Sequence, residues 1–202
     1  MKLEQNEFLK DVKNHQIEII RDNGNNRHIR FKQPNTNNMY FDLVTWDGYL
    51  VFTGDMGSYM FTRVRDMFSF FRSDLSETDD RLLIDRRYWG EKCVAVDKNS
   101  PIEVYSQEKF KNAINEYLDS VNASQEIRDR VYDDVISQSD DNEYFAMQAA
   151  IDFEHDGFMF HDFWETNVYE YSYMFTWCCY AIVWGIREYD KTVQNHVLSV
   201  SH

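Results

Sequence analysis

The stretch YFDLVTWDGYLVFTGDMGSYMFT, residues 40–62, decides the fold of the first part of the chain. β-Branched and aromatic residues predominate at positions 40–46, 49–53 and 59–62, and glycine-containing turn sequences separate these runs at 47–48 and 54–57. Two further short runs, at 17–20 and 28–31, flank the turn sequence DNGNN at 22–26. Consecutive short strands joined by tight turns form antiparallel sheets, so we predict an N-terminal antiparallel β-meander of four to five strands.

The sequence period becomes helical after residue 65, as it is in a short amphipathic segment at 2–14. Asp66, Ser106 and Ser124 each precede a segment with apolar residues at helical spacing, and their side chains suit N-caps. A further helix is predicted over 143–153. Residues 173–189 are apolar on all sides for about twelve positions, which predicts a buried terminal helix with the other elements packed around it. The fold class is therefore α+β, with a mainly helical C-terminal half.

Length and composition favour a single α+β domain over residues 1–202, with a sheet-rich part at 1–72 and an acidic helical part at 73–202. No apolar run reaches the roughly 18 residues of a membrane span, and the N-terminus lacks the apolar stretch of a signal peptide. We therefore expect a cytoplasmic protein without a membrane partner. Cys93, Cys178 and Cys179 show no metal-binding spacing and are expected to be buried free thiols.

The charge of the chain is concentrated in one segment. Residues 1–72 contain ten basic and nine acidic side chains, a net charge of +1, whereas residues 73–202 contain eleven basic and 26 acidic ones, a net charge of −15; the whole chain carries −14. Between residues 112 and 170, fifteen acidic residues face only two basic ones, Arg128 and Arg130. A charge-neutral first third thus precedes a strongly anionic remainder.

An acidic segment of this kind either forms a solvated surface that keeps the protein soluble or binds a basic partner. Carboxylates at three-and-four spacing on a helix lie about 5–6 Å apart. Duplex DNA carries one negative charge per roughly 1.7 Å of its axis, so such rows can imitate a phosphate track. The predicted partner-binding carboxylates are Glu116, Asp119, Glu126, Asp129, Asp133, Asp134, Asp140 and Asp141.

One other cluster has metal-binding side chains. His155, Asp156, His161 and Asp162, together with Asp55 from a turn of the meander, could hold Zn²⁺ or Mn²⁺ in a hydrolase for a phosphate-containing substrate. A helix would place His155 and His161 on opposite sides, which favours caps and turns for this segment instead. The chain contains no nucleophile-elbow, zinc-protease or Cys–His signature. We therefore expect neither catalytic residues nor a cofactor, with the hydrolase as the alternative.

Two sets of side chains bear on direct nucleic-acid binding. Aromatic residues that suit either base stacking or core packing, with core packing favoured, are Trp46, Tyr49, Tyr88 and Trp89. Basic residues that could gather on the outer face of the sheet are Arg27, Arg30, Lys32, Arg63 and Arg65. Because the overall field of the protein repels phosphate, we expect no direct contact with nucleic acid.

Four motifs also suggest a relationship: FDLVTWDG at 41–48, GDMG at 54–57, DMFSFFR at 66–72 and WCCYAIVWG at 177–185. With them, residues 29–190 resemble a family of bacteriophage and prophage accessory proteins that have no assigned reaction. The resemblance implies a small, phage-encoded protein of the host cytoplasm, and it supplies no functional residues. Small acidic phage proteins often inhibit host defence, as anti-CRISPR and anti-restriction proteins do.

The leading hypothesis is therefore a non-enzymatic inhibitor that binds a basic, nucleic-acid-handling host protein, such as a defence nuclease or CRISPR effector, possibly as a DNA mimic. A third interpretation is a phage structural or regulatory protein that forms a homodimer through exposed aromatic side chains.

Overall fold

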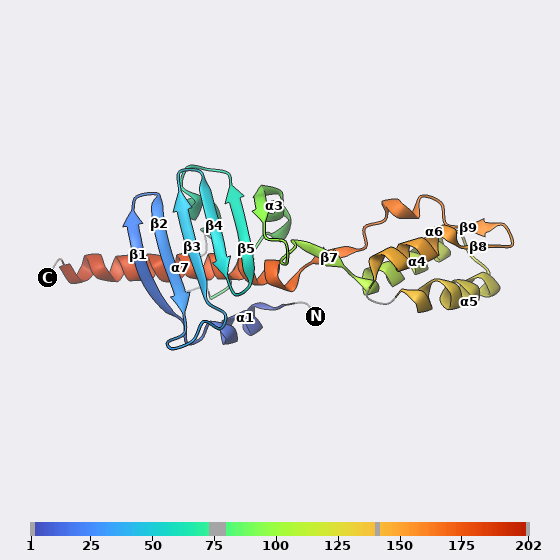
Figure 1. Ribbon diagram of the computed structural model, residues 1–202, viewed down its shortest axis with the longest axis horizontal. Coiled ribbons are helices and arrows are strands. Elements are labelled where there is room, and N and C mark those ends of the chain that lie inside the picture. Colours follow the sequence, from blue (N-terminus) through green and yellow to red (C-terminus); the bar gives the residue numbers. More distant parts are fainter. Residues whose placement is uncertain (1–2, 73–79, 140–141, 201–202) are drawn as a thin grey trace. The chain divides into compact units, whose positions relative to one another are not determined.

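The computed structural model describes residues 3–72, 80–139 and 142–200, and the chain divides into two compact units (Figure 1). Unit 1 comprises residues 1–102 and 171–202, and unit 2 comprises residues 103–170. The single domain expected over residues 1–202, from a sequence without an internal repeat or an interdomain linker, stays a prediction.

Unit 1 is built on a six-stranded antiparallel sheet in which each strand pairs with the next, in the order β1 to β6. The strands are β1 (Gln16–Asn23), β2 (Asn26–Lys32), β3 (Phe41–Trp46), β4 (Tyr49–Gly54), β5 (Gly57–Thr62) and β6 (Cys93–Val96). The predicted meander is thus confirmed. The sixth strand, which the sequence did not predict, joins the sheet after two intervening helices.

The turns of the meander follow from their glycines. Trp46 pairs with Tyr49 across the two-residue Asp47-Gly48 turn, in which Gly48 has φ 84°, a left-handed conformation that favours glycine. The β1–β2 turn likewise places Gly24 at φ 59°. These tight connections set the register, so that alternate side chains of each strand point to the same face.

One face of the sheet is covered by the terminal helix α7 (Tyr173–Val200), which crosses behind the strands in Figure 1. The large side chains on this face are fully or almost fully buried: Ile29, Phe31, Phe41, Leu43, Leu50, Phe52, Tyr59 and Phe61. A Cβ at Gly185 of α7 would lie 3.0 Å from Leu43 Cδ1 and 3.1 Å from a Phe31 ring carbon, so the helix approaches the sheet closely there. The predicted buried terminal helix is confirmed.

Three short helices complete unit 1: α1 (Gln5–Asp11), α2 (Met67–Phe71) and α3 (Arg86–Lys92). The predicted cap of α2 is confirmed, since the Asp66 carboxylate accepts a hydrogen bond from the Phe68 amide at 3.1 Å. Cys178 and Cys179 of α7 are completely buried, and desolvation raises the pKa of both thiols well above the usual range. Both are therefore structural side chains, as predicted.

Unit 2 has its own hydrophobic core. Its helices are α4 (Gln107–Ser120), α5 (Gln125–Asp134), η1 (Ile136–Gln138), α6 (Glu143–Asp152) and η2 (Phe163–Glu165). Two small two-stranded sheets accompany them, one of β7 (Glu103–Tyr105) with β10 (Tyr169–Tyr171) and one of β8 (Glu154–His155) with β9 (Phe158–Met159). Its core includes Phe110, Ile114, Leu118, Val131 and Phe163, and none of the described α7 side chains belongs to that cluster. The expectation that these helices pack around the terminal helix is therefore wrong for α4, α5 and α6.

Among the described residues, no helix combines the length and the apolar character that crossing a bilayer requires.

Candidate functional site

The acidity of the chain coincides with unit 2. Residues 103–170 contain 17 acidic and four basic side chains, which leaves 18 acidic and 17 basic ones for the rest of the chain. Unit 1 is thus almost neutral, and unit 2 carries nearly the whole net charge. Charge of one sign on one compact body creates a field that attracts basic partners over several ångströms.

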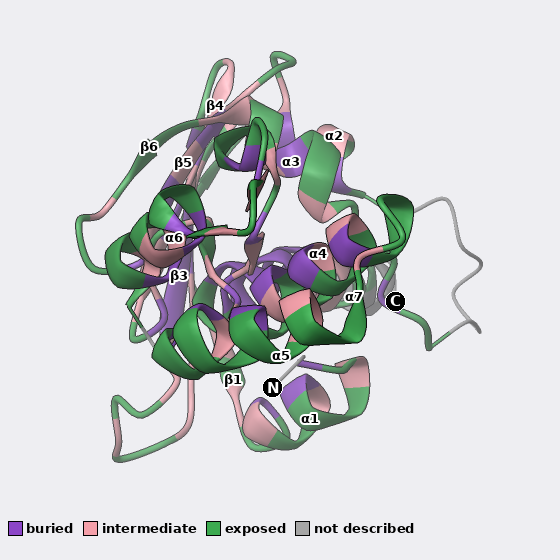
Figure 2. Ribbon diagram, turned by 90° about the vertical axis from the view of Figure 1, so that its right-hand side faces the viewer, coloured by how far each residue is buried: buried purple, intermediate pink, exposed green. Residues whose placement is uncertain are grey.

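The predicted carboxylates of unit 2 are exposed where they are described. Glu116 and Asp119 lie on α4, and α5 contributes four exposed carboxylates in the helix seen at the front of Figure 2: Glu126, Asp129, Asp133 and Asp134. Ser124 caps α5 by accepting from the Ile127 amide at 3.3 Å. Glu126, Asp129 and Asp133 share one face of the helix because they are three and then four residues apart. The other two predicted residues, Asp140 and Asp141, lie outside the described residues.

Contacts inside unit 2 neutralise part of this surface. Asp119 forms an ion pair with Arg128 at 2.8 Å, and the Asp129 carboxylate accepts from Gln125 at 2.8 Å. Exposed Arg130 lies four residues after Glu126 and three before Asp133, on the same face of α5 as these two, and so breaks the row of negative charge. Within the described parts of the chain, the carboxylates of Asp133 and Asp134 have no ion-pair or hydrogen-bond partner. These two are the most available groups for a basic ligand.

Unit 2 also exposes large aromatic side chains that the sequence analysis did not single out. Tyr132 of α5 is 62% exposed, Tyr144 and Phe145 of α6 are 69% and 60% exposed, and Trp164 of η2 is 59% exposed. Exposed aromatic residues are common anchors of protein–protein interfaces. The part of the exterior of unit 2 to which these exposed carboxylates and rings contribute is called the acidic–aromatic surface below.

The predicted metal cluster is assembled only in part. The ring of His155 lies 3.7 Å from a carboxylate oxygen of Asp156 and 3.7 Å from one of Glu126, and the ligand atoms of these three residues lie within 4.8 Å of one another. Three such ligands suit Zn²⁺ or Mn²⁺. However, the Glu126 and Asp156 side chains are 74% and 79% exposed, and no hydrogen bond from another described residue orients them.

The other members of that cluster have different surroundings. Exposed His161 and Asp162 belong to no metal-capable group of three among the described residues. Asp55 belongs to unit 1, where its carboxylate accepts from the Met39 amide at 2.9 Å and so stabilises a turn, as the sequence favoured. His155 and Asp156 are not helical, because the Asp156-Gly157 turn joins β8 to β9 with φ 48° and 78°.

The side of the sheet that points away from α7 is called the open face here. Its side chains alternate with the buried ones and include His28, Arg30, Asp42, Val44, Val51 and Met60. Of the basic residues expected here, Arg27 points to the other face, where its guanidinium lies 2.9 Å from Asp66 and 4.7 Å from the Phe68 ring centre. Arg63 and Arg65 follow β5 instead of lying in it, so of the predicted basic cluster Arg30 and Lys32 of β2 are the members on the open face.

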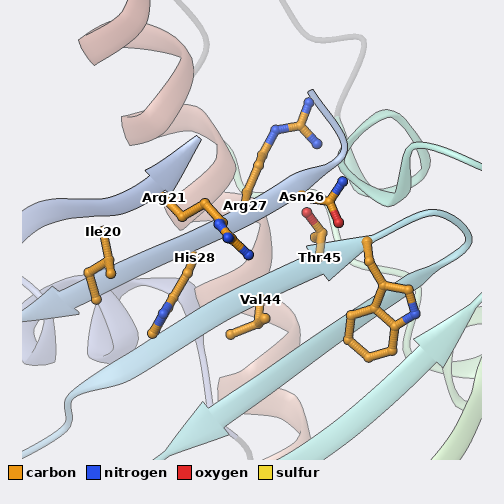
Figure 3. Close-up of a pocket in the computed structure, with 8 residues that line it drawn as sticks. Ile20, Arg21, Asn26, Arg27, His28, Val44 and Thr45 are labelled. Atoms are coloured by element: carbon orange, nitrogen blue, oxygen red, sulfur yellow. The ribbon is translucent and has the colours of Figure 1, made fainter. Parts of the chain in front are cut away.

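The prediction of core packing is confirmed for Trp89 and wrong for Trp46. Trp89 is 7% exposed, whereas Trp46 and Tyr88 are each 37% exposed. Trp46 stacks on Tyr49 with ring centres 5.2 Å apart and planes at 24°. Trp46 also lines a pocket formed by residues of β1, β2 and β3, which Figure 3 shows in close-up.

Asp42 is a nearly buried carboxylate on the open face. It accepts hydrogen bonds from Arg30 at 2.8 and 2.9 Å and from His28 at 2.8 Å. Desolvation alone would raise the pKa of this carboxyl, but the hydrogen bonds from Arg30 and His28 outweigh it and lower the pKa below the usual value.

We predict that Asp42→Asn lowers the free energy of unfolding at pH 7 by about 2 kcal/mol, since hydrogen bonds to a charged acceptor are lost. A lowered folded-state pKa means that the Asp42 contribution is complete above the unfolded-state pKa and disappears as pH falls through the folded-state value. The difference between the two proteins in urea unfolding should therefore shrink below about pH 4. Asp119→Asn, an exposed control, should cost less than about 1 kcal/mol. A difference that stays constant down to pH 2 would contradict this role.

In comparisons with known proteins, no protein-family model, curated protein or solved structure matches the chain. The resemblance to phage accessory proteins therefore stays a prediction.

Proposed function

We propose that this chain is a non-enzymatic inhibitor of a host defence system, of the anti-CRISPR or anti-restriction type, that acts in the cytoplasm on a basic, nucleic-acid-handling protein. The observation that carries the proposal is that nearly all of the net negative charge lies in unit 2. The carboxylates predicted to bind the partner are exposed wherever the structure describes them. The phage origin rests on the resemblance alone.

The acidic–aromatic surface supports protein binding more than pure DNA mimicry. A DNA mimic needs an unbroken track of negative charge, and the Asp119–Arg128 pair and Arg130 interrupt it. Protein interfaces instead combine aromatic anchors with a polar rim, and Trp and Tyr dominate their binding energy. We propose that Asp133 and Asp134 contact lysines or arginines of the partner while exposed rings such as Trp164 anchor the complex.

The test is binding to a purified Cas9-type CRISPR effector and a panel of restriction endonucleases, measured at low and high salt. Wild-type affinity for the target should fall about tenfold or more between 50 and 200 mM salt, because screening weakens contacts between exposed charges. The variant E126Q/D129N/D133N/D134N should bind about 30-fold more weakly, since four exposed contacts each contribute roughly 0.5 kcal/mol or more.

A matched pair of double variants separates local contact from overall charge. D133N/D134N removes two carboxylates without partners among the described residues, and E18Q/E91Q removes two exposed carboxylates of unit 1. Only the first should weaken binding beyond the small effect of net charge. Equal effects of both doubles, or an affinity without salt dependence, would reject the acidic–aromatic surface as the contact.

The metal-dependent hydrolase stays the alternative because one observation favours it, the grouping of Glu126, His155 and Asp156. If this alternative is correct, Zn²⁺ or Mn²⁺ should raise the melting temperature of the wild-type protein. His155→Ala should abolish that rise, and His161→Ala should leave it unchanged. The homodimer interpretation requires a concentration-dependent molecular mass.

A further inference from the structure

The open face of unit 1 contains a second candidate site, created by a β-bulge. Ile19 pairs with Ile29, but the register then shifts so that Arg21, rather than Ile20, lies opposite His28. Directly opposed residues share a face of the sheet, so the bulge brings Arg21 to the open face beside His28. In a regular ladder Arg21 would oppose Arg27 and point to the α7 side.

The bulge forms one wall of a pocket of about 420 Å³, within the range of roughly 300–1,000 Å³ typical of small-molecule sites. The pocket is lined by parts of the following residues, of which Arg21 and His28 are the bases on the open face and none is a carboxylate: Ile20, Arg21, Asn26, Arg27, His28, Val44, Thr45 and Trp46. Figure 3 shows Ile20, His28 and Val44 projecting to one side of neighbouring strands while the Arg21 side chain extends across β2.

Arg21 is the available charge of this pocket. Arg27 is occupied by Asp66, and His28 by Asp42. Arg21 is exposed and forms no hydrogen bond or ion pair with any other described residue. An arginine with a free guanidinium fork favours a ligand with phosphate or carboxylate oxygens, which it can bind with two parallel hydrogen bonds.

Trp46 supplies a flat apolar surface in the same pocket. Tyr49, which is not among the lining residues, stacks on the Trp46 ring and so holds the orientation of the indole. His28 is oriented by the bond from Nε2 to Asp42, which leaves Nδ1 as the ring nitrogen available to a ligand. The pocket therefore joins a stacking surface to a free cation.

We propose that this pocket binds a nucleoside monophosphate, with the phosphate on Arg21 and the base against Trp46. A planar ring suits the indole, and the phosphate suits the guanidinium in a lining without carboxylates. A single nucleotide fits the pocket, whereas a longer single strand needs a basic groove that tracks several phosphates. Arg30 of the open face is already paired with Asp42, so it is not available for a second phosphate. This site is independent of the function proposed for unit 2.

The test is an NMR titration of the full chain with AMP, CMP, GMP and UMP, followed at backbone amides and the tryptophan indole N–H groups. At least one nucleotide should saturate the protein with a Kd on the order of 0.1–1 mM, from one stacked base and one charge-assisted contact. Shifts should concentrate at Arg21, His28 and Trp46. The matching nucleoside lacks the phosphate, and inorganic phosphate lacks the base. Each should bind at least about tenfold more weakly than the nucleotide.

Two pairs of variants identify the contacts. Arg21→Gln and Trp46→Leu should each weaken nucleotide binding about tenfold, whereas Arg63→Gln and Trp164→Leu, which replace exposed residues outside the pocket, should leave it unchanged. Equal binding by the pocket variants and wild type, shifts located elsewhere, or no saturation at millimolar nucleotide would overturn the proposal. If an oligonucleotide of eight thymidine nucleotides bound more tightly than any mononucleotide, the mononucleotide proposal would be overturned in favour of a nucleic-acid site.

Discussion

Replacing Trp177 by alanine is expected to lower the free energy of unfolding by about 4 kcal/mol, one of the two largest effects predicted here. Trp177 of α7 is fully buried between α1 and the sheet, with its ring centre 5.1 Å from that of Phe8 and 5.6 Å from that of Phe41. Its Nε1 donates a 2.9 Å hydrogen bond to Asp11. The substitution removes the ring contacts and this bond together, and the surrounding aromatic rings cannot close the cavity completely.

Urea unfolding followed by far-ultraviolet circular dichroism measures this effect. Trp164→Ala is the matched control, because Trp164 is 59% exposed and its removal should change stability by no more than about 0.5 kcal/mol. Trp177→Phe keeps most of the packing and should cost about 1–2 kcal/mol, so the role remains measurable if the alanine variant does not fold. Equal stability of the two alanine variants would show that α7 does not organise the core of unit 1.

The second large effect is expected at Gly54, where β4 ends. A Cβ on Gly54 would lie 2.1 Å from the backbone oxygen of Tyr40 and 2.7 Å from Phe41 Cα. Both obstacles are backbone, and Phe41 pairs with Gly54 across the β3–β4 ladder. Relief therefore requires the strands to separate, and we expect Gly54→Ala to cost about 3 kcal/mol.

Gly24→Ala is the comparison that isolates this steric effect. Gly24 has φ 59° in the β1–β2 turn, and a Cβ there would meet no atom within 4 Å. Gly24→Ala should therefore lower the free energy of unfolding by about 1 kcal/mol, the cost of placing an alanine in a left-handed backbone conformation. If thermal and urea unfolding showed Gly54→Ala to be as stable as Gly24→Ala, the close approach of Tyr40 to β4 would be contradicted.

The parts of the fold that could be predicted from the sequence are those with local signals. The Asp47-Gly48 turn and the alternation of residues such as Leu50 and Phe52 are read within a few positions, and so is the Ser124 cap of α5. β6 has no such signal, because its four residues pair with distant β5 and three of them are exposed. The boundaries of unit 2 were missed for a similar reason, since no linker composition marks residues 103 and 170.

The candidate sites likewise include features that could be predicted from the sequence and features that could not. The acidity of unit 2 is a property of composition, so it could be read directly from the sequence. The approach of Glu126 to His155 depends on how α5 packs on the β8–β9 hairpin, which residue spacing cannot reveal. Arg21 was not singled out because its direction depends on a one-residue shift of register in β1. Neither arrangement follows from periodicity.

The contact surface of the complex is tested most directly by zero-length carbodiimide cross-linking of the chain to the nuclease that binds it most tightly, followed by peptide mass spectrometry. This reagent joins a carboxylate to a lysine amine only where the two touch. We expect cross-links from Asp133 and Asp134 and their α5 neighbours to partner lysines at low salt, and their loss at high salt. Cross-links confined to carboxylates of unit 1, or unchanged by salt, would contradict the assignment of binding to the acidic–aromatic surface.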